Sequence, residues 1–382
     1  FNQVAYAFCN TALKTIPLLN FSNASGFNST FYGSDIETLP LLDTSNVVDW
    51  PWCFRDCHNL KEFPLLDTSK ATVLNYTWSR NYSLTSFPLI DTSSVTSLPW
   101  TWWINNSLTS FPLIDTSSVL SFDSTWRGCT SLTSFPLIDT SACTSFSNAW
   151  YGCSSLTSFP LLDTSSVSSF YYTWRSCNNL TSFPLLDTSS VNIFDYAWYG
   201  CSSLTSFPAI VLKNGVTLTY AWYGCSSLTS FPLLNFTGVT GLISTFSQCS
   251  GITSLPLFDT SSVTTFNNTF SGMSALATFP AINLSSGVDF TASCANASSL
   301  TTFPANMFDN CQTTVYNSAF WNCALDETSV NGILVSIALA ASTYTLTGDT
   351  LTMNGGTSAA PTGAGITAKD ALIAAGWTVA TN

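Results

Sequence analysis

The chain has 382 residues, of which 8% are charged and 46% hydrophobic, and its formal net charge is −12. Its few cations are scattered along the sequence, which argues against nucleic acid, whose phosphates require clustered cations, and against docking on an anionic membrane. The hydrophobic content is too high for a disordered chain, and no apolar run reaches the 18 residues of a membrane-spanning helix, so membrane insertion is not expected.

The N-terminal residues already belong to a repeat. Val4 and Phe8 occupy apolar repeat positions, and no polar cap precedes them. We expect an apolar N-terminal edge that a preceding segment or another copy would cover.

Proline marks the period of this repeat. It recurs at Pro17, at Pro40 and then every 24 residues up to Pro304. A fixed period of this length is typical of a solenoid, in which each turn buries its apolar groups only against its neighbours. We therefore predict a leucine-rich-repeat-like solenoid of about thirteen turns over residues 1–325.

Each turn has two apolar sides. Around Pro160, one side has strand spacing: Leu156, Phe159 and Leu161. The return side has residues three or four apart: Val167, Phe170, Trp174 and Cys177. We expect a parallel β-sheet on the first face and short helices, 3₁₀ turns or irregular segments on the second, because Ser, Thr and Val form helices poorly.

The residue pair after each proline is ambiguous. Strict alternation would point Leu162 and Ile138 outward and create an apolar stripe for protein binding, whereas a bend at the Asp-Thr-Ser turn would bury them. We favour the bend, because such a stripe would aggregate. Proline in every strand also removes one ladder donor per turn.

One repeat position carries a large aromatic residue in turn after turn. Its tryptophans are Trp78, Trp102, Trp126, Trp150, Trp174, Trp198 and Trp222. We predict a buried spine rather than an exposed ladder, because each ring can bury about 150–250 Å².

The full pattern G-C-S-S-L-T-S-F-P-L-[LI]-D-T-S-S-V-x-x-F-x-x-[TA]-W resembles the BspA-like leucine-rich repeats over roughly residues 1–325. The chain departs from them in its tryptophans, where phenylalanine is frequent, and in its strand proline. The resemblance implies extracellular display, on a cell surface or a virion, with adhesion or host contact. It supplies no catalytic residue.

Cysteine and aspartate form two further columns. The cysteines are Cys57, Cys129, Cys153, Cys177, Cys201, Cys225 and Cys249. We interpret them as buried thiols, although neighbours about 5 Å apart could form a disulfide. The aspartates are Asp43, Asp67, Asp91, Asp115, Asp139, Asp163 and Asp187. Each precedes Thr-Ser or Ser-type residues and should accept hydrogen bonds in an Asx turn; the alternative is Ca²⁺ bound between turns.

An enzyme is not expected. The only histidine is His58, no nucleophile or nucleotide motif occurs, and a ladder of equivalent aspartates offers no pair with divergent pKa values. We expect no cofactor and no zinc site.

Two columns of aromatic residues are predicted at the surface. Their proposed ligand-binding members are Trp100, Trp103, Tyr151, Tyr172, Tyr196, Tyr199, Tyr220 and Tyr223. Members three residues apart in one repeat, such as Tyr196 and Tyr199, can meet on one surface. They could bind a host-surface glycan or protein; alternatively they pack sideways on the adjacent turns.

Residues 326–382 lack the repeat and are predicted to form a cap. We expect a helix over 329–341, a strand over 344–353, and a helix over 367–375 with Thr367 as N-cap. Together these features predict a non-enzymatic surface recognition or adhesion protein. The alternative is a structural subunit of an extracellular fibre or virion coat that assembles through its N-terminal edge.

Overall fold

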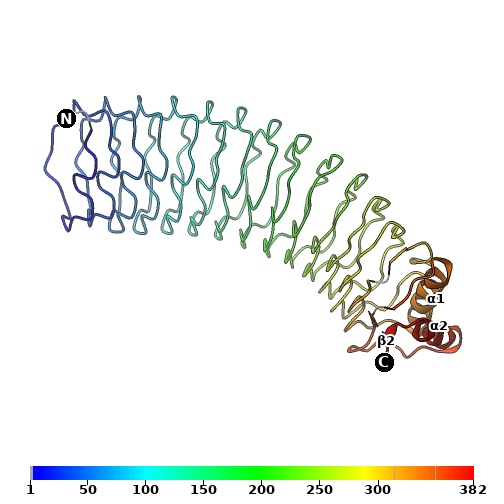
Figure 1. Cartoon of the computed structure of the whole chain (residues 1–382). Helices are drawn as coiled ribbons and strands as arrows, with labels where there is room; N and C mark the ends of the chain where they lie inside the picture. Colours follow the sequence, from blue (N-terminus) through cyan, green and yellow to red (C-terminus); the bar gives the residue numbers. More distant parts are fainter. Residues whose placement is uncertain (1–2, 314, 349) are drawn as a thin grey trace. The chain divides into compact units, whose positions relative to one another are not determined.

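The computed structural model describes residues 3–313, 315–348 and 350–382. The chain forms two compact units, Phe1–Ser190 and Val191–Asn382. Each unit is a series of stacked coils, and the helices lie at the C-terminal end of the second unit (Figure 1).

The return side of each coil is a ribbon of overlapping turns. In the first unit, Ala149 N–H donates to Phe146 O at 3.0 Å, and Cys153 N–H donates to Trp150 O at 3.0 Å. Trp150 N–H donates in turn to Thr173 O of the next coil at 3.0 Å. Of the forms expected for this side, the irregular one is correct, because helices occur among the described residues only at 327–343 and 363–374.

The parallel β-sheet expected on the proline side was wrong. In the described residues this side has only isolated parallel bridges, such as Ser230 to Ser254 in the second unit. Pro160 has no N–H, and Leu162 N–H donates back to Pro160 O at 3.0 Å. This tight i to i−2 turn withdraws a second donor from the ladder, so a continuous strand cannot form.

The same turn decides the ambiguous pair. Leu162 is 3% exposed and Ile138 is also buried, as predicted, but the bend lies at the proline rather than at the Asp-Thr-Ser turn. Leu161 was expected to point inward and is instead 62% exposed. In the first unit we call the exposed residues that follow each proline the leucine stripe: Leu41, Leu65, Leu89, Leu113, Leu137, Leu161 and Leu185.

The predicted tryptophan spine is confirmed, since all seven side chains are fully buried. In the first unit the rings of Trp126 and Trp150 stack with centroids 5.4 Å apart, and Phe135 packs edge-on against Trp126 at 4.7 Å. In the second unit Trp198 and Trp222 stack at 5.4 Å. Alternating stacked and edge-on contacts are the favoured geometries for aromatic pairs, so each coil is held to the next by its largest side chains.

The cysteine column is buried beside this spine, and all of its members are thiols. Cys153 Sγ donates to Trp126 O of the preceding coil at 3.2 Å. Burial raises the pKa of Cys129 and of Cys249 to about 12. These thiols therefore act as small, neutral packing groups.

The C-terminal region contains α1 (Glu327–Thr343), β1 (Thr350–Thr352), α2 (Gly363–Ala374) and β2 (Thr378–Ala380). The first predicted helix is confirmed and begins after Asp326, whose Oδ1 accepts from Ser329 N–H at 2.7 Å. Neither α1 nor α2 combines the length and apolar content needed to cross a bilayer, as far as the described residues extend.

Two details of this region were wrong. The strand expected over 344–353 is limited to β1, and residue 349 lies outside the described residues. The second helix begins at Gly363 after the extended Thr362, so Thr367 is an interior residue rather than the N-cap. The sequence gave no signal for β2, which pairs in parallel with β1. The boundary after residue 325 stays a prediction.

Candidate binding surface

The aromatic columns of the first unit are half-buried at the surface of the turn ribbons. Trp100 and Trp103 meet edge-on at 5.2 Å between ring centroids, and Tyr76 stacks on Trp100 at 5.7 Å. Tyr151 and Tyr172 lie 6.1 Å apart. The structure thus brings the predicted residues of this unit into contact along and across the coils.

The second unit has its own cluster of four half-buried tyrosines. Tyr196 stacks on Tyr220 with centroids 4.8 Å apart and planes 10° from parallel. Tyr199 stacks on Tyr223 at 4.6 Å and 7°. Both expected features therefore coexist: the rings pack sideways on adjacent coils, and their outer edges remain at the surface.

Arginine belongs to the same columns, which the sequence reasoning missed. Arg127 and Arg175 occupy the repeat position of Trp103 and Tyr151, because the four residues are spaced by 24. The Arg127 guanidinium lies 4.6 Å from the Tyr151 ring centroid, and that of Arg175 lies 5.0 Å from Tyr172. The alternation of Trp, Arg, Tyr and Arg at one position was the available signal for cation–π contacts.

One aromatic column has a strained backbone. Trp100, Tyr172, Tyr196 and Tyr220 have φ values between 56° and 58°, in the left-handed region. At the same repeat position Asn148 fits this conformation better, because its short polar side chain tolerates it. A bulky residue there costs about 1 kcal/mol or more, which makes a role at the surface a reasonable hypothesis.

The ring geometry limits the available chemistry. Stacking places the face of one tyrosine ring against its neighbour, so a ligand would meet mainly ring edges, hydroxyls and guanidinium groups. Burial raises the pKa of Tyr223, and the nearby Tyr199 and Tyr220 add to the shift. The Tyr223 hydroxyl is therefore a neutral donor and acceptor at physiological pH.

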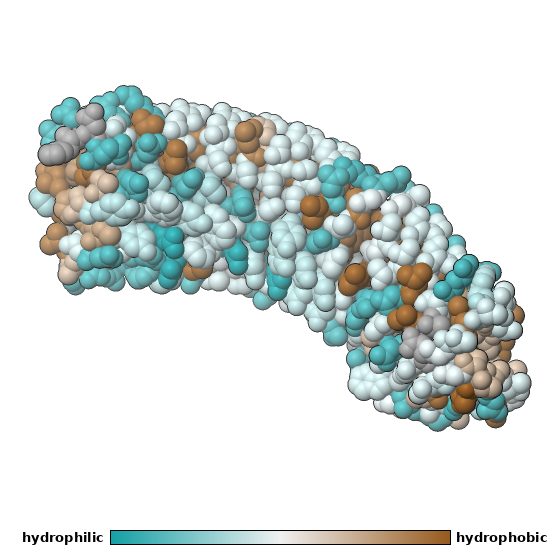
Figure 2. Space-filling model, in the orientation of Figure 1, coloured by the Kyte–Doolittle hydropathy of each residue, from teal (hydrophilic) through white to brown (hydrophobic). Residues whose placement is uncertain are grey.

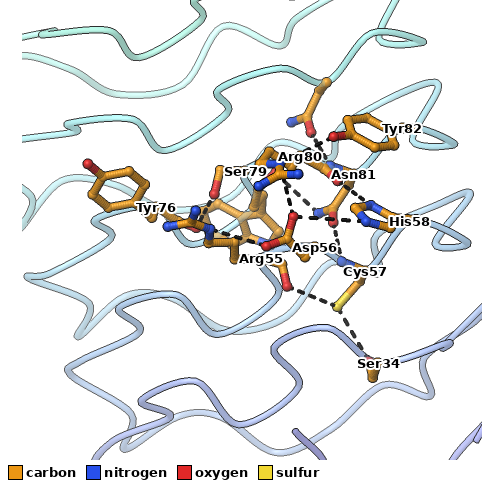
Figure 3. Close-up of polar contacts among 12 residues, drawn as sticks. Ser34, Arg55, Asp56, Cys57, His58, Tyr76, Ser79, Arg80, Asn81 and Tyr82 are labelled. Atoms are coloured by element: carbon orange, nitrogen blue, oxygen red, sulfur yellow. Dashed lines mark hydrogen bonds and ion pairs between the residues drawn. The ribbon is translucent and has the colours of Figure 1, made fainter. Parts of the chain in front are cut away.

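A charged network joins the first-unit aromatic columns at their N-terminal side (Figure 3). Arg55 Nε lies 3.3 Å from Asp56 Oδ2, and Arg80 Nε lies 3.0 Å from Asp56 Oδ1. The Arg55 guanidinium also lies 5.2 Å from the Tyr76 ring centroid and 5.8 Å from that of Trp103. Asp56 thus orients two guanidinium groups beside the aromatic surface.

The histidine beside this network lacks the geometry of a catalytic base. His58 stacks on Tyr82 at 4.5 Å, and its Nε2 lies 4.0 Å from Asp56 Oδ1 (Figure 3). The neighbouring Cys57 Sγ lies 3.4 Å from Ser34 Oγ in the interior, and burial raises the Cys57 pKa to about 12. A thiol with this pKa supplies almost no thiolate nucleophile at neutral pH.

The Asx turns predicted for the aspartate column are confirmed. Asp163 Oδ1 accepts from Ser165 N–H at 3.0 Å and from Ser165 Oγ at 2.7 Å. Thr164 Oγ1 donates to Asp187 O of the next coil at 2.6 Å. The alternative of bound Ca²⁺ gains no support, since the described part of the chain contains no cluster of three or more His, Cys, Asp or Glu residues that could hold a metal ion.

Beyond these columns, the surface is polar but weakly charged. The visible face of the coils is mainly pale in Figure 2, between the hydrophilic and hydrophobic extremes. This agrees with a chain in which only 8% of the residues are charged. Binding at such a surface would depend on its few aromatic and charged side chains.

The comparisons with known proteins agree with the repeat pattern. The family model described as "BspA type Leucine rich repeat region (6 copies)" matches residues 4–109, 102–229 and 193–326. A leucine-rich repeat protein from Eubacterium ventriosum has a similar crystal structure, with 19% identity, a TM-score of 0.39, and coverage of 60% of this chain and 68% of that one. A leucine-rich cell surface protein from Faecalibacterium prausnitzii has 15% identity, a TM-score of 0.35, and coverage of 75% and 86%. No curated protein matches the sequence.

Proposed function

Since the chain belongs to the BspA type leucine-rich repeat family, we propose that it is a non-enzymatic recognition protein displayed at a cell surface, which binds a host glycan or protein. Membership of this family suggests a binding or adhesion role, and one of the similar crystal structures is titled as that of a cell surface protein. The ligand and the residues that contact it are our proposal.

The observation that carries the proposal is the set of half-buried aromatic side chains at the surface of an otherwise weakly charged coil stack. Tyr and Trp provide large contact areas at a small cost in conformational entropy. In the first unit the guanidinium groups of Arg127 and Arg175 lie over the Tyr151 ring at 4.6 and 5.4 Å. Arg, Tyr and Trp are the residues that dominate binding energy in protein interfaces.

The geometry favours a protein over a glycan. A sugar usually stacks on an aromatic face, but Tyr196 and Tyr220 cover one another at 4.8 Å. Ring edges, hydroxyls and guanidinium groups suit the polar and apolar groups of a protein surface. A glycan would have to bind by hydrogen bonds along the ring edges.

The first experiment uses a glycan array and a panel of extracellular host proteins, probed with the full chain. We expect a ligand that is lost in the double variant Tyr196→Ala, Tyr220→Ala, with binding retained in Tyr344→Ala, a tyrosine in the C-terminal region. Tyr223→Phe keeps the stacked ring and tests the hydroxyl alone. Unchanged binding by the double variant would refute the tyrosine surface as the site.

Electron microscopy of the purified chain separates the proposal from its alternative. A recognition protein should give discrete particles that bind ligand. Regular filaments would instead support the structural subunit of an extracellular fibre or virion coat that the sequence also allows.

A further inference from the structure

The leucine stripe is a continuous apolar feature of the first unit. It places one leucine per coil at 24-residue intervals from Leu41 to Leu185, and each is 59–67% exposed. Single exposed leucines are ordinary, but a row of seven at one repeat position is not. This row plays no part in the core, since the adjacent residue of each pair fills the interior.

The aspartate column borders the leucine stripe. At the start of the first unit, Leu18, Leu41, Asn20 and Asp43 line the same surface hollow of about 440 Å³. The second unit repeats this arrangement, where Leu233, Leu257, Asn235 and Asp259 line a hollow of about 350 Å³. Apolar and acidic groups therefore alternate around shared hollows between successive coils.

The charge of this surface is one-sided. Residues 81–190 contain six aspartates but only two cations, Arg127 and Arg175. Both cations lie over aromatic rings of the turn ribbon, including that of Tyr151. Between Leu89 and Leu185 the stripe thus has acidic neighbours in every coil without an equal number of basic ones.

The spacing of the coils fits a helical partner. Successive stacked tryptophans between Trp102 and Trp174 are separated by 6.0, 5.4 and 6.1 Å. An α-helix rises about 5.4 Å per turn, whereas same-face residues of a strand recur about every 6.7 Å. A helix laid along the stripe would present about one apolar and one flanking residue to each coil.

From these observations we propose that the leucine stripe and its bordering aspartates bind a basic amphipathic α-helix of a protein partner. Apolar residues of the helix would cover the leucines, and its lysines or arginines would face the aspartates. A second copy of this chain is a poor occupant, because two stripes in contact would bring two aspartate columns together. The proposal is independent of the aromatic surface.

The test uses a fluorescent synthetic helix of about 21 residues, long enough to span roughly six coils. Its apolar face carries Leu at i, i+3, i+4 and i+7, and its flanks carry Lys. An otherwise identical peptide has Glu in place of Lys. Anisotropy titrations of both peptides with the full chain are measured at low and at physiological salt.

Natural variation in the repeat supplies variants that should fold. Asn235 occupies the aspartate position, and its Oδ1 still accepts from Thr237 N–H at 3.0 Å, so Asp139→Asn and Asp163→Asn should preserve the turn. Ala209 occupies the stripe position, so Leu137→Ala and Leu161→Ala have a precedent. Asp123→Asn removes one charge on the turn-ribbon side and serves as the matched control.

We expect the Lys peptide to bind and the Glu peptide not to bind. The double Asp→Asn variant should bind the Lys peptide about three- to tenfold more weakly with a smaller salt dependence, because exposed ion pairs contribute modestly. The double Leu→Ala variant should lose at least as much, and Asp123→Asn should match the unmodified chain. Equal binding of both peptides, or an equal loss in Asp123→Asn, would overturn the proposal. So would concentration-dependent self-association at neutral pH that both leucine substitutions abolish.

Discussion

The guanidinium of Arg127 lies 4.6 Å from the ring centroid of Tyr151, which holds the same position in the next coil. The contact joins two coils at the surface, whereas Trp126 and Trp150 join the same coils in the interior. Surface recognition and coil stacking therefore involve neighbouring residues of the turn ribbon.

Replacing Arg127 tests how much the surface contact contributes to stability. Arg127→Met keeps most of the aliphatic stem and removes the cation, and we expect it to lower the free energy of unfolding by about 0.5–1 kcal/mol. Urea unfolding followed by tryptophan fluorescence measures the change. Arg127→Lys should lose less, and an unchanged midpoint for Arg127→Met would show that the ring contact is energetically silent.

Replacing Trp126 tests the spine. Its Nε1 has no hydrogen-bond acceptor among the described residues, and the equivalent residue in the second unit is Phe246 or Phe270. We expect Trp126→Phe to cost less than about 1.5 kcal/mol, since it removes an unsatisfied donor along with some volume.

Trp126→Ala is the contrasting variant, and it should cost about 3–5 kcal/mol by leaving a cavity between Trp102 and Trp150. Both variants are compared by calorimetric melting. Similar melting temperatures for the Phe and Ala variants would argue against a tightly packed spine.

The Asx turns predict how stability depends on acid. Hydrogen bonds from the backbone N–H and then the hydroxyl of Ser141 hold the pKa of Asp139 below its ordinary value, and Ser117 does the same for Asp115. The stabilisation is present above the unfolded pKa of about 3.9 and is lost as pH falls through the lower folded pKa. Melting temperatures measured from pH 6 to pH 2 should fall below about pH 4, and less steeply in Asp139→Asn. An identical slope in this variant would remove the turn as the cause.

Thiol chemistry gives a further prediction. Cys9 is half-buried, whereas the other cysteines are buried, and burial raises the pKa of Cys129 to about 12. Under native conditions at neutral pH we expect iodoacetamide to modify Cys9 alone, and Cys9→Ser to abolish the fast phase. Rapid labelling of several thiols in that variant would show that the interior opens.

The raised thiol pKa values also predict loss of stability in alkali. An unfolded cysteine titrates near 8.5, so the stabilisation of the neutral thiol is complete below that pH and is lost as pH rises toward about 12. Melting temperatures should therefore decline above about pH 8.5, with a smaller decline in Cys129→Ala.

The sequence predicted the features that depend on residue type and period. Trp126 is buried because a large ring at a fixed repeat position can be covered only by its neighbours, and Asp163 forms a turn because Ser165 follows at the right distance. The exposure of Leu161 was not predictable from period alone. It depends on the tight turn from Leu162 N–H to Pro160 O, which reverses the alternation of a strand.

The surface was predicted in part. The aromatic columns follow from Tyr196 and Tyr220 lying 24 residues apart, but the stacking of their faces depends on the coil separation, which the sequence does not state. Arg127 was overlooked because aromatic and cationic residues were considered separately, although both occupy one repeat position. The second strand of the C-terminal pair has only three residues, too few for a period to show.

The tight turn at each proline makes the exterior modular. Every intact coil from Leu41 to Leu185 supplies one outward leucine and one aspartate at a constant offset. Gain or loss of a whole 24-residue segment by recombination would lengthen or shorten this face by one unit without altering its chemistry. Partner length could thus be matched through copy number, while a deletion of any other size would misalign the leucines with the turns that expose them.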